Sequence, residues 1–281
     1  MKSRVWCAVM LMSCLSVFVI GGAVQAAEPQ PSAEYRYAVT TSWLECCLRD
    51  LEGRETPVVR VCPPGTCPGH FDLTPGSLGD LQRCRLLFLF DFQKSIEEKF
   101  GVMTGLNLEL AAITAPQGMC VPPRYMEGCQ SVRDVLVRVH PDKNDAYASA
   151  LEKTRLRLAG LERETREQIS KSGLNGAKVV TSKHQAEFCR WLGLDVVAAY
   201  SGGDAASPAA LQSLVQDAKA AHASLVIANL QEGRQFGEAV ARQIGAKLVV
   251  FSNFPDMTPK QDSFDALLRD NLGQLTAAVH E

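Results

Sequence analysis

A long charged stretch constrains the fold of this chain more than any other feature of the sequence. It covers residues 141–173 and contains no proline after Pro141. Apolar residues such as Tyr147, Leu158 and Ile169 recur at spacings that place them on one face of a helix. A helix of about 25–30 residues would be about 40 Å long, and its apolar positions are too irregular for a coiled coil. The stretch therefore predicts one rigid helix between two globular parts.

Short apolar segments alternate with amphipathic helical segments on both sides of this helix. The expected strands include PVVRVC and RLLFLF before it, and KVVT, SLVIANL and KLVVF after it. Such alternation is typical of parallel sheets covered by helices. The predicted fold class is α/β, with two parallel-sheet lobes at 35–140 and 174–281, one long interlobe helix at 141–173, and a ligand cleft between the lobes.

The first 26 residues have the pattern of a secretory signal peptide. Lys2 and Arg4 precede an apolar run that ends near Ile20, and Val-Gln-Ala follows, with cleavage expected after Ala26. Residues 27–34 would then form a flexible leader. The protein is expected to be exported to the periplasm. Cys14 leaves a lipoprotein as the alternative.

Net charge and cysteine content give two indications, one about nucleic-acid binding and one about disulfide bonds. The net charge of -2 gives no reason to expect nucleic-acid binding, and we expect a monomer. Removal of the signal leaves eight of ten cysteines, which in an exported protein suggests disulfides. The short-loop candidates are Cys62 with Cys67 and Cys120 with Cys129. Thiolate ligation of a soft or borderline metal is the alternative for any of them.

His184 carries the first functional clue, because it follows an apolar strand and opens a helix in AKVVTSKHQAEFCRWLGLDVVA. Ligands of open α/β sheets bind at the carboxyl ends of strands. A single histidine remains weak evidence for a site.

Several blocks of the sequence resemble the zinc/manganese class of metal-binding solute receptors that serve ABC transporters. They are PPGTCPGHFDLTPGSL, HPDKNDAY, TSKHQAEFCRWLGLDVV, GAKLVVFSNF and DNLGQL. The resemblance covers nearly the whole mature chain. It implies a transport receptor rather than an enzyme, with an ABC permease as its partner and a metal ion as its ligand. It also places His70 and His184 at two of the metal-binding positions.

The remaining two ligand positions depart from the pattern of that family. GMCVPPRYM stands where a His-x-Trp segment is usual, so Cys120 is the expected occupant. Asn253, or Ser252 if the register slips by one, replaces the acidic ligand. A set of His70, His184, Cys120 and Asn253 would suit zinc, whereas manganese prefers carboxylate oxygen.

Two alternatives remain open from the sequence. The same fold could bind Cu(I) or a metal complex through Cys120, Met119 and histidine. A secreted thiol enzyme is the other class, but the sequence lacks a Cys-x-x-Cys motif, a nucleophile elbow and a phosphate-binding glycine loop.

Overall fold

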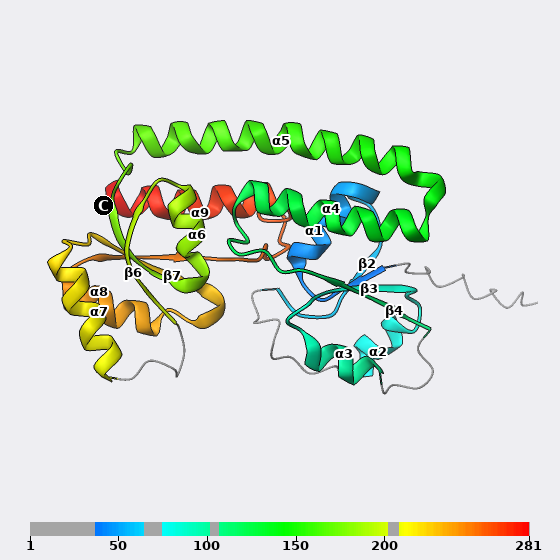
Figure 1. Cartoon of the computed structure of the whole chain (residues 1–281), viewed down its shortest axis with the longest axis horizontal. Coiled ribbons are helices and arrows are strands. Elements are labelled where there is room, and N and C mark those ends of the chain that lie inside the picture. Colours follow the sequence, from blue (N-terminus) through cyan, green and yellow to red (C-terminus); the bar gives the residue numbers. More distant parts are fainter. Residues whose placement is uncertain (1–36, 65–74, 102–106, 202–207, 281) are drawn as a thin grey trace, which may run out of the picture. The chain divides into compact units, whose positions relative to one another are not determined.

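Two four-stranded parallel sheets form the framework of the protein in the computed structural model (Figure 1). The structure describes residues 37–64, 75–101, 107–201 and 208–280. The predicted signal peptide and leader, together with Cys67 and His70, lie outside the described residues.

The two sheets have related strand orders. The first is ordered β2-β1-β3-β4 and the second β6-β5-β7-β8, and every paired strand is parallel. The strands are β1 (Tyr37–Val39), β2 (Val58–Arg60), β3 (Leu86–Phe90), β4 (Glu109–Ile113), β5 (Lys178–Ser182), β6 (Asp195–Tyr200), β7 (Leu225–Asn229) and β8 (Lys247–Phe251). This architecture confirms the predicted fold class of two parallel-sheet lobes and a long helix.

Helices cover both faces of each sheet, as Figure 1 shows. They are α1 (Ser42–Glu52), α2 (Pro75–Leu81), α3 (Lys94–Gly101), α4 (Pro122–Val139), α5 (Asn144–Lys171), α6 (Ala186–Trp191), α7 (Pro208–Ala220), α8 (Gln235–Ile244) and α9 (Phe264–His280), with short 3-10 turns η1 (Pro141–Lys143), η2 (Lys183–Gln185) and η4 (Leu230–Glu232). In the first lobe α1 and α4 lie on one face and α2 and α3 on the other. In the second lobe α7 and α8 lie opposite α9.

One hydrophobic core runs through both lobes on the side of α1, α4 and α9. Phe88 and Leu136 of the first lobe and Phe251 and Leu272 of the second belong to the same cluster of buried side chains. Smaller cores fill the opposite faces beneath α2 and α3 and beneath α7 and α8. The shared core holds the loops at one edge of each sheet near one another.

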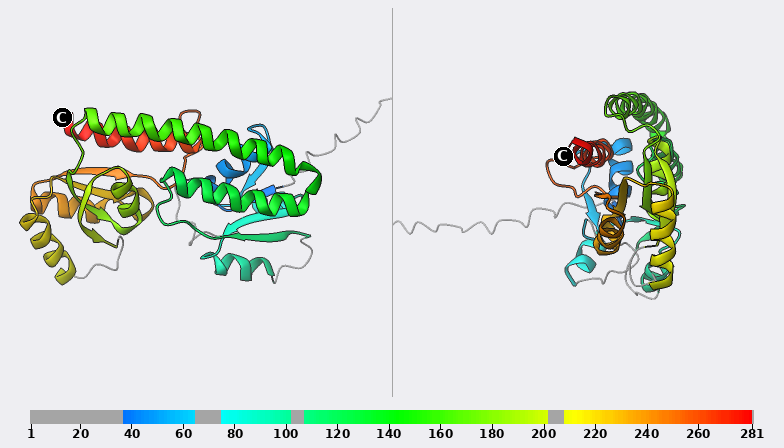
Figure 2. Two further views of the ribbon diagram at one scale, coloured as in Figure 1. Left: turned by 45° about the horizontal axis from the view of Figure 1, so that its top comes forward. Right: turned by 90° about the vertical axis from the view of Figure 1, so that its left-hand side faces the viewer.

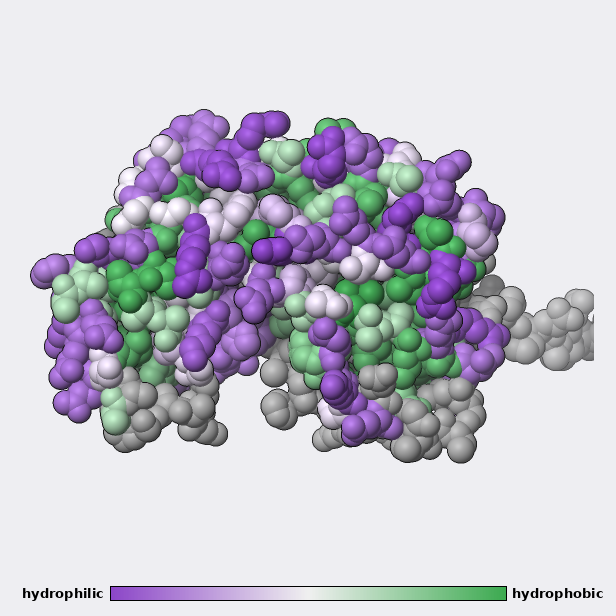
Figure 3. Space-filling model, viewed as in Figure 1, coloured by the Kyte–Doolittle hydropathy of each residue, from purple (hydrophilic) through white to green (hydrophobic). Residues whose placement is uncertain are grey.

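The predicted long helix is α5, which packs on α1 and α4 and then on α9. Figures 1 and 2 show α9 beside the carboxyl half of α5. The outward face of α5 is mostly hydrophilic in Figure 3. Helix α5 carries exposed ion pairs such as Arg155 with Glu152. Within the described residues, no helix combines the length and the apolar character needed to cross a membrane.

Local sequence signals explain where helix α1 begins and ends. Thr41 caps the amino end of helix α1, because its hydroxyl accepts a hydrogen bond from the Leu44 N–H at 3.3 Å. It stops at Gly53, where φ is 108°, a conformation that glycine adopts at no steric cost. Trp43 lies on the first turn of α1 and is buried in the core.

Candidate metal-binding site

Cys120 lies in the loop that precedes α4, where the first lobe touches the second. Its side chain is 0% exposed. The thiol donates a hydrogen bond to the Ser252 carbonyl at 3.1 Å, and the Asn271 side chain donates to the sulfur at 3.5 Å. The Trp43 indole N–H holds the same loop by donating to the Met119 carbonyl at 2.8 Å. Groups of both lobes therefore fix the position of Cys120.

Three side chains at the carboxyl ends of strands complete this cluster. Gln185 and Asn253 follow β5 and β8, and Asn229 is the last residue of β7. The Gln185 amide N–H₂ donates to Asn253 Oδ1 at 2.9 Å and to Asn229 Oδ1 at 3.1 Å. Asn253 Oδ1 also lies 3.9 Å from the Cys120 sulfur. We call Cys120, Gln185, Asn229 and Asn253 the amide-thiol cluster.

Gln185 has one polar atom that no group of the described residues satisfies. The residue is 0% exposed, yet its Oε1 has no hydrogen-bond partner there. An unpaired buried acceptor costs about 1–3 kcal/mol in free energy of folding. A water, a ligand atom or an ion could supply the missing interaction.

The cluster is electrically neutral. Burial raises the pKa of the Cys120 thiol far above its usual range, and the nearby Cys189 thiol raises it further, although the Asn271 hydrogen bond acts in the opposite direction. Burial likewise raises the pKa of Cys189 to about 12. A metal that takes Cys120 as a thiolate must therefore displace its proton.

The predicted site residues are only partly brought together. Cys120 and Asn253 meet in the amide-thiol cluster, and Ser252, the alternative to Asn253, contributes its backbone carbonyl. His184 lies apart from them, with a side chain 63% exposed and Nε2 3.5 Å from Glu232. His70 is outside the described residues.

Gln185 is the residue that sequence reasoning missed. It follows His184 directly in η2, and it points into the cluster whereas His184 points to solvent. The position of Gln185 just beyond the end of β5 could have identified it as a candidate, because Gln185 and His184 both lie at the carboxyl end of that strand. Ser182 sets the turn by accepting a hydrogen bond from the His184 N–H at 3.2 Å.

No disulfide joins Cys120 to Cys129 in the structure; every described cysteine carries a thiol there, so the predicted bridge is judged by the placement of the two residues. Cys120 lies before α4, while Cys129 lies about two turns into that helix, a rise of about 10 Å. The sulfur of Cys120 contacts the second lobe, whereas Cys129 lies beside Cys47, whose pKa is raised by burial and further by Cys129. The Cys62–Cys67 pairing stays a prediction because Cys67 is not described.

The donor atoms of the amide-thiol cluster can be compared with those that a metal ion requires. Among the described residues, no three His, Cys, Asp or Glu side chains are grouped to hold an ion. The cluster offers one thiol and neutral amide oxygens. A zinc site here needs at least one further nitrogen or sulfur donor.

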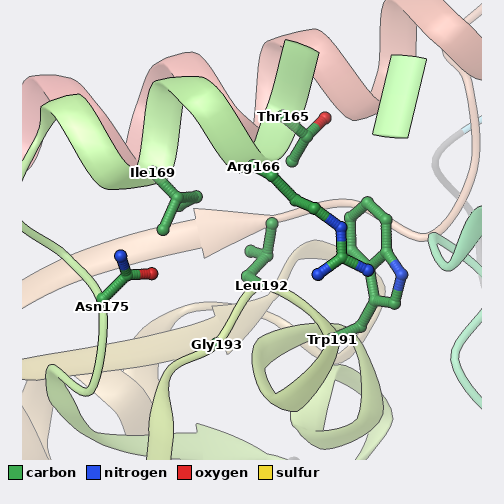
Figure 4. A pocket seen from close by; sticks show the side chains of 7 residues that line it. All are labelled: Thr165, Arg166, Ile169, Asn175, Trp191, Leu192 and Gly193. Carbon is green, nitrogen blue, oxygen red and sulfur yellow. The ribbon is translucent and has the colours of Figure 1, made fainter. Parts of the chain in front are cut away.

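A separate pocket of about 200 Å³ lies between α5 and the end of α6 (Figure 4). Arg166 reaches from α5 toward Trp191 there. Asn175 and Gly193, which precede β5 and β6, also line it. The pocket is thus at the amino ends of the strands, opposite to the edge where ligands of such sheets bind.

Solved structures similar to this one include metal-binding proteins. A manganese-bound periplasmic metal-binding protein from Candidatus Liberibacter asiaticus superimposes with a TM-score of 0.72 at 11% identity, covering 86% of this chain and 98% of that one. ZnuA superimposes with a TM-score of 0.70 at 19% identity, covering 87% and 98%. A zinc-bound deletion mutant of ZnuA gives a TM-score of 0.68 at 18% identity, covering 86% and 97%.

The sequence itself provides the family assignment. No curated protein sequence matches the chain significantly. Residues 120–278, more than half of the chain, match the family model described as ZnuA, zinc-uptake complex component A, periplasmic. This segment begins at Cys120 and contains the long helix and all but the last three residues of the second lobe. The chain therefore belongs to the family of the periplasmic component A of zinc-uptake complexes.

Proposed function

We propose that the protein is an extracytoplasmic receptor that captures a divalent transition-metal ion, zinc before manganese, and delivers it to the permease of an ABC transporter. Family membership supports this function. The observation that carries it is the convergence of Cys120, from the loop before α4 in the first lobe, with Gln185 and Asn253, from strand ends of the second, with Gln185 Oε1 unpaired among the described residues.

The ligand set in this proposal combines sulfur, nitrogen and amide oxygen. Cys120 provides a thiolate, Asn253 or Gln185 an amide oxygen, and His70 and His184 the nitrogens that zinc prefers. His184 is exposed and lies beside Glu232, so this ligand set requires its side chain to turn toward the cluster when the metal binds. A thiolate and imidazoles favour zinc over manganese.

Titration of metal-stripped protein tests the proposal. We expect zinc to bind with a dissociation constant below about 1 μM and manganese about 100-fold more weakly. Cys120→Ser and His70→Ala should each weaken zinc binding by at least about 10-fold, since each removes a proposed ligand. The control is Cys84→Ala, a buried cysteine of a different core cluster, which should leave affinity unchanged. Binding of neither ion more tightly than about 1 mM would exclude a metal receptor.

Cu(I) is the second candidate ligand. Cys189 is close enough to Cys120 to act on it electrostatically, and soft sulfur with neutral donors suits a monovalent ion. Anaerobic competition between Cu(I) and zinc separates the two functions. A zinc preference unaffected by Cys120→Ser would remove the argument from the thiolate.

A thiol enzyme is disfavoured by the state of Cys120. Catalytic thiols are activated by a lowered pKa and are partly accessible. Cys120 is fully buried, and its burial raises the pKa. We therefore propose a binding rather than a catalytic role.

A further inference from the structure

Helices α1 and α4 pack at close range in the first lobe. The rings of Trp43 and Tyr125 are 5.2 Å apart between centroids. A Cβ atom at Gly128 would lie only 2.2 Å from the Trp43 ring. Glycine at this position therefore allows the two helices to approach each other closely.

One helical turn beyond this contact, each helix carries a buried cysteine. Cys47 follows Trp43 by four residues, and Cys129 follows Tyr125 by four, so each cysteine lies on the same helix face as its aromatic residue. Both cysteines are 0% exposed and belong to one core cluster. Burial raises the pKa of the Cys47 thiol, and the neighbouring Cys129 side chain raises it further.

We propose that Cys47 and Cys129 form a disulfide bond between α1 and α4 under the oxidising conditions that an exported protein meets. The two thiols lose two protons and two electrons as the S–S bond forms. A small-molecule disulfide such as oxidised glutathione accepts them, and its own S–S bond is cleaved to give two thiols. Exchange has to occur before the helices close, because the folded thiols are inaccessible.

Cys46 is the competing partner, and its surroundings differ. Adjacent residues of a helix point about 100° apart. Cys46 lines a pocket of about 340 Å³ together with charged side chains that include Asp50 and Arg157. The Cys46 side chain thus points toward this charged pocket. A metal bound by these thiols is not an alternative, since no set of three such ligands is formed among the described residues.

The test is a peptide map of the full chain after refolding with oxidised and reduced glutathione, with remaining thiols alkylated before digestion. We expect the tryptic peptide that ends at Arg49 to be linked to the one that contains Cys129. Cys46 and Cys47 share a peptide, so Cys46→Ala should keep the link and Cys47→Ala should abolish it. Cys84→Ala serves as the matched control and should keep it.

Reduction should lower the thermal midpoint of the linked protein by about 5–10 °C, because the cross-link restricts the unfolded chain. The unlinked Cys47→Ala protein should show no such change on reduction. Complete alkylation of Cys47 and Cys129 in the wild-type protein, or a link through Cys46 instead, overturns the proposal. If a variant fails to fold, fragmentation of the linked wild-type peptide between Cys46 and Cys47 shows which of the two residues carries the link. Neither result depends on metal binding.

Discussion

Replacing Trp43 by alanine is expected to lower the free energy of unfolding by about 3–5 kcal/mol. Trp43 is 0% exposed and packs against Phe90, Tyr125 and Gly128. Its removal leaves a cavity between α1 and α4 that rigid helices fill only partly. It also leaves the Met119 carbonyl without the indole donor that holds the Cys120 loop. Urea denaturation followed by circular dichroism measures the change.

Two further variants separate the parts of this effect. Trp43→Phe keeps an aromatic ring but loses the N–H, so it should cost about 1–3 kcal/mol, less than the alanine variant. Trp191→Ala removes a half-buried tryptophan that stacks on Phe188 and should cost less than half as much as Trp43→Ala. Equal losses at Trp43 and Trp191 would contradict the central place of Trp43 in the core.

Replacing Arg157 by methionine is expected to destabilise the protein by about 2–3 kcal/mol at neutral pH. Arg157, on α5, pairs with Asp50 of α1 and, at 2.7 Å, with Asp265 of α9. The two carboxylates are mostly buried, with side chains 23% and 12% exposed. Loss of the guanidinium leaves the two carboxylates without a compensating charge. The Arg157 side chain is itself 34% exposed, which limits the loss of stability.

The loss of stability caused by Arg157→Met should become smaller as the pH falls. Burial raises the pKa of Asp50, and Arg157 opposes that rise. Without Arg157 the pKa rises further, so Asp50 takes up a proton at a higher pH and then needs no cationic partner. A carboxyl with a raised pKa in the folded state contributes stability below that pKa and loses it as the pH rises. Urea midpoints at about pH 7 and about pH 5 measure the difference.

Arg155→Met is the matched control on the same helix. Arg155 is 56% exposed and pairs across the surface with Glu152. Its replacement should change stability by less than about 1 kcal/mol at either pH. An Arg157→Met loss as small as that of Arg155→Met, or one that does not depend on pH, would contradict the role of Arg157.

The fold was predictable because its signals are local. The apolar run RLLFLF became β3 with five buried residues, and the long charged stretch became α5 after a short 3-10 turn at Pro141–Lys143. Periodicity and chain length carry this information within a window of about 11–18 residues. The parallel arrangement followed from the alternation of strands and helices.

The candidate site was predictable only in part. The sequence placed Cys120 and Asn253 at loops that can converge, and they do meet. It could not choose between His184 and Gln185, which are neighbours, because the direction of each side chain depends on the turn that Ser182 and Glu232 hold. Nothing local distinguishes the residue that enters the cluster from the one that faces solvent.

The cysteines show the same division between sequence and tertiary structure. The sequence alone determined the α/β architecture, the long helix and the number of thiols, because these depend on composition and short-range periodicity. Only tertiary packing decided which thiols are neighbours. Cys120 and Cys129 are close in sequence but separated along α4, whereas Cys47 and Cys129, far apart in the sequence, meet because α1 and α4 pack together. Helix packing brings distant residues together, and no local pattern encodes that contact.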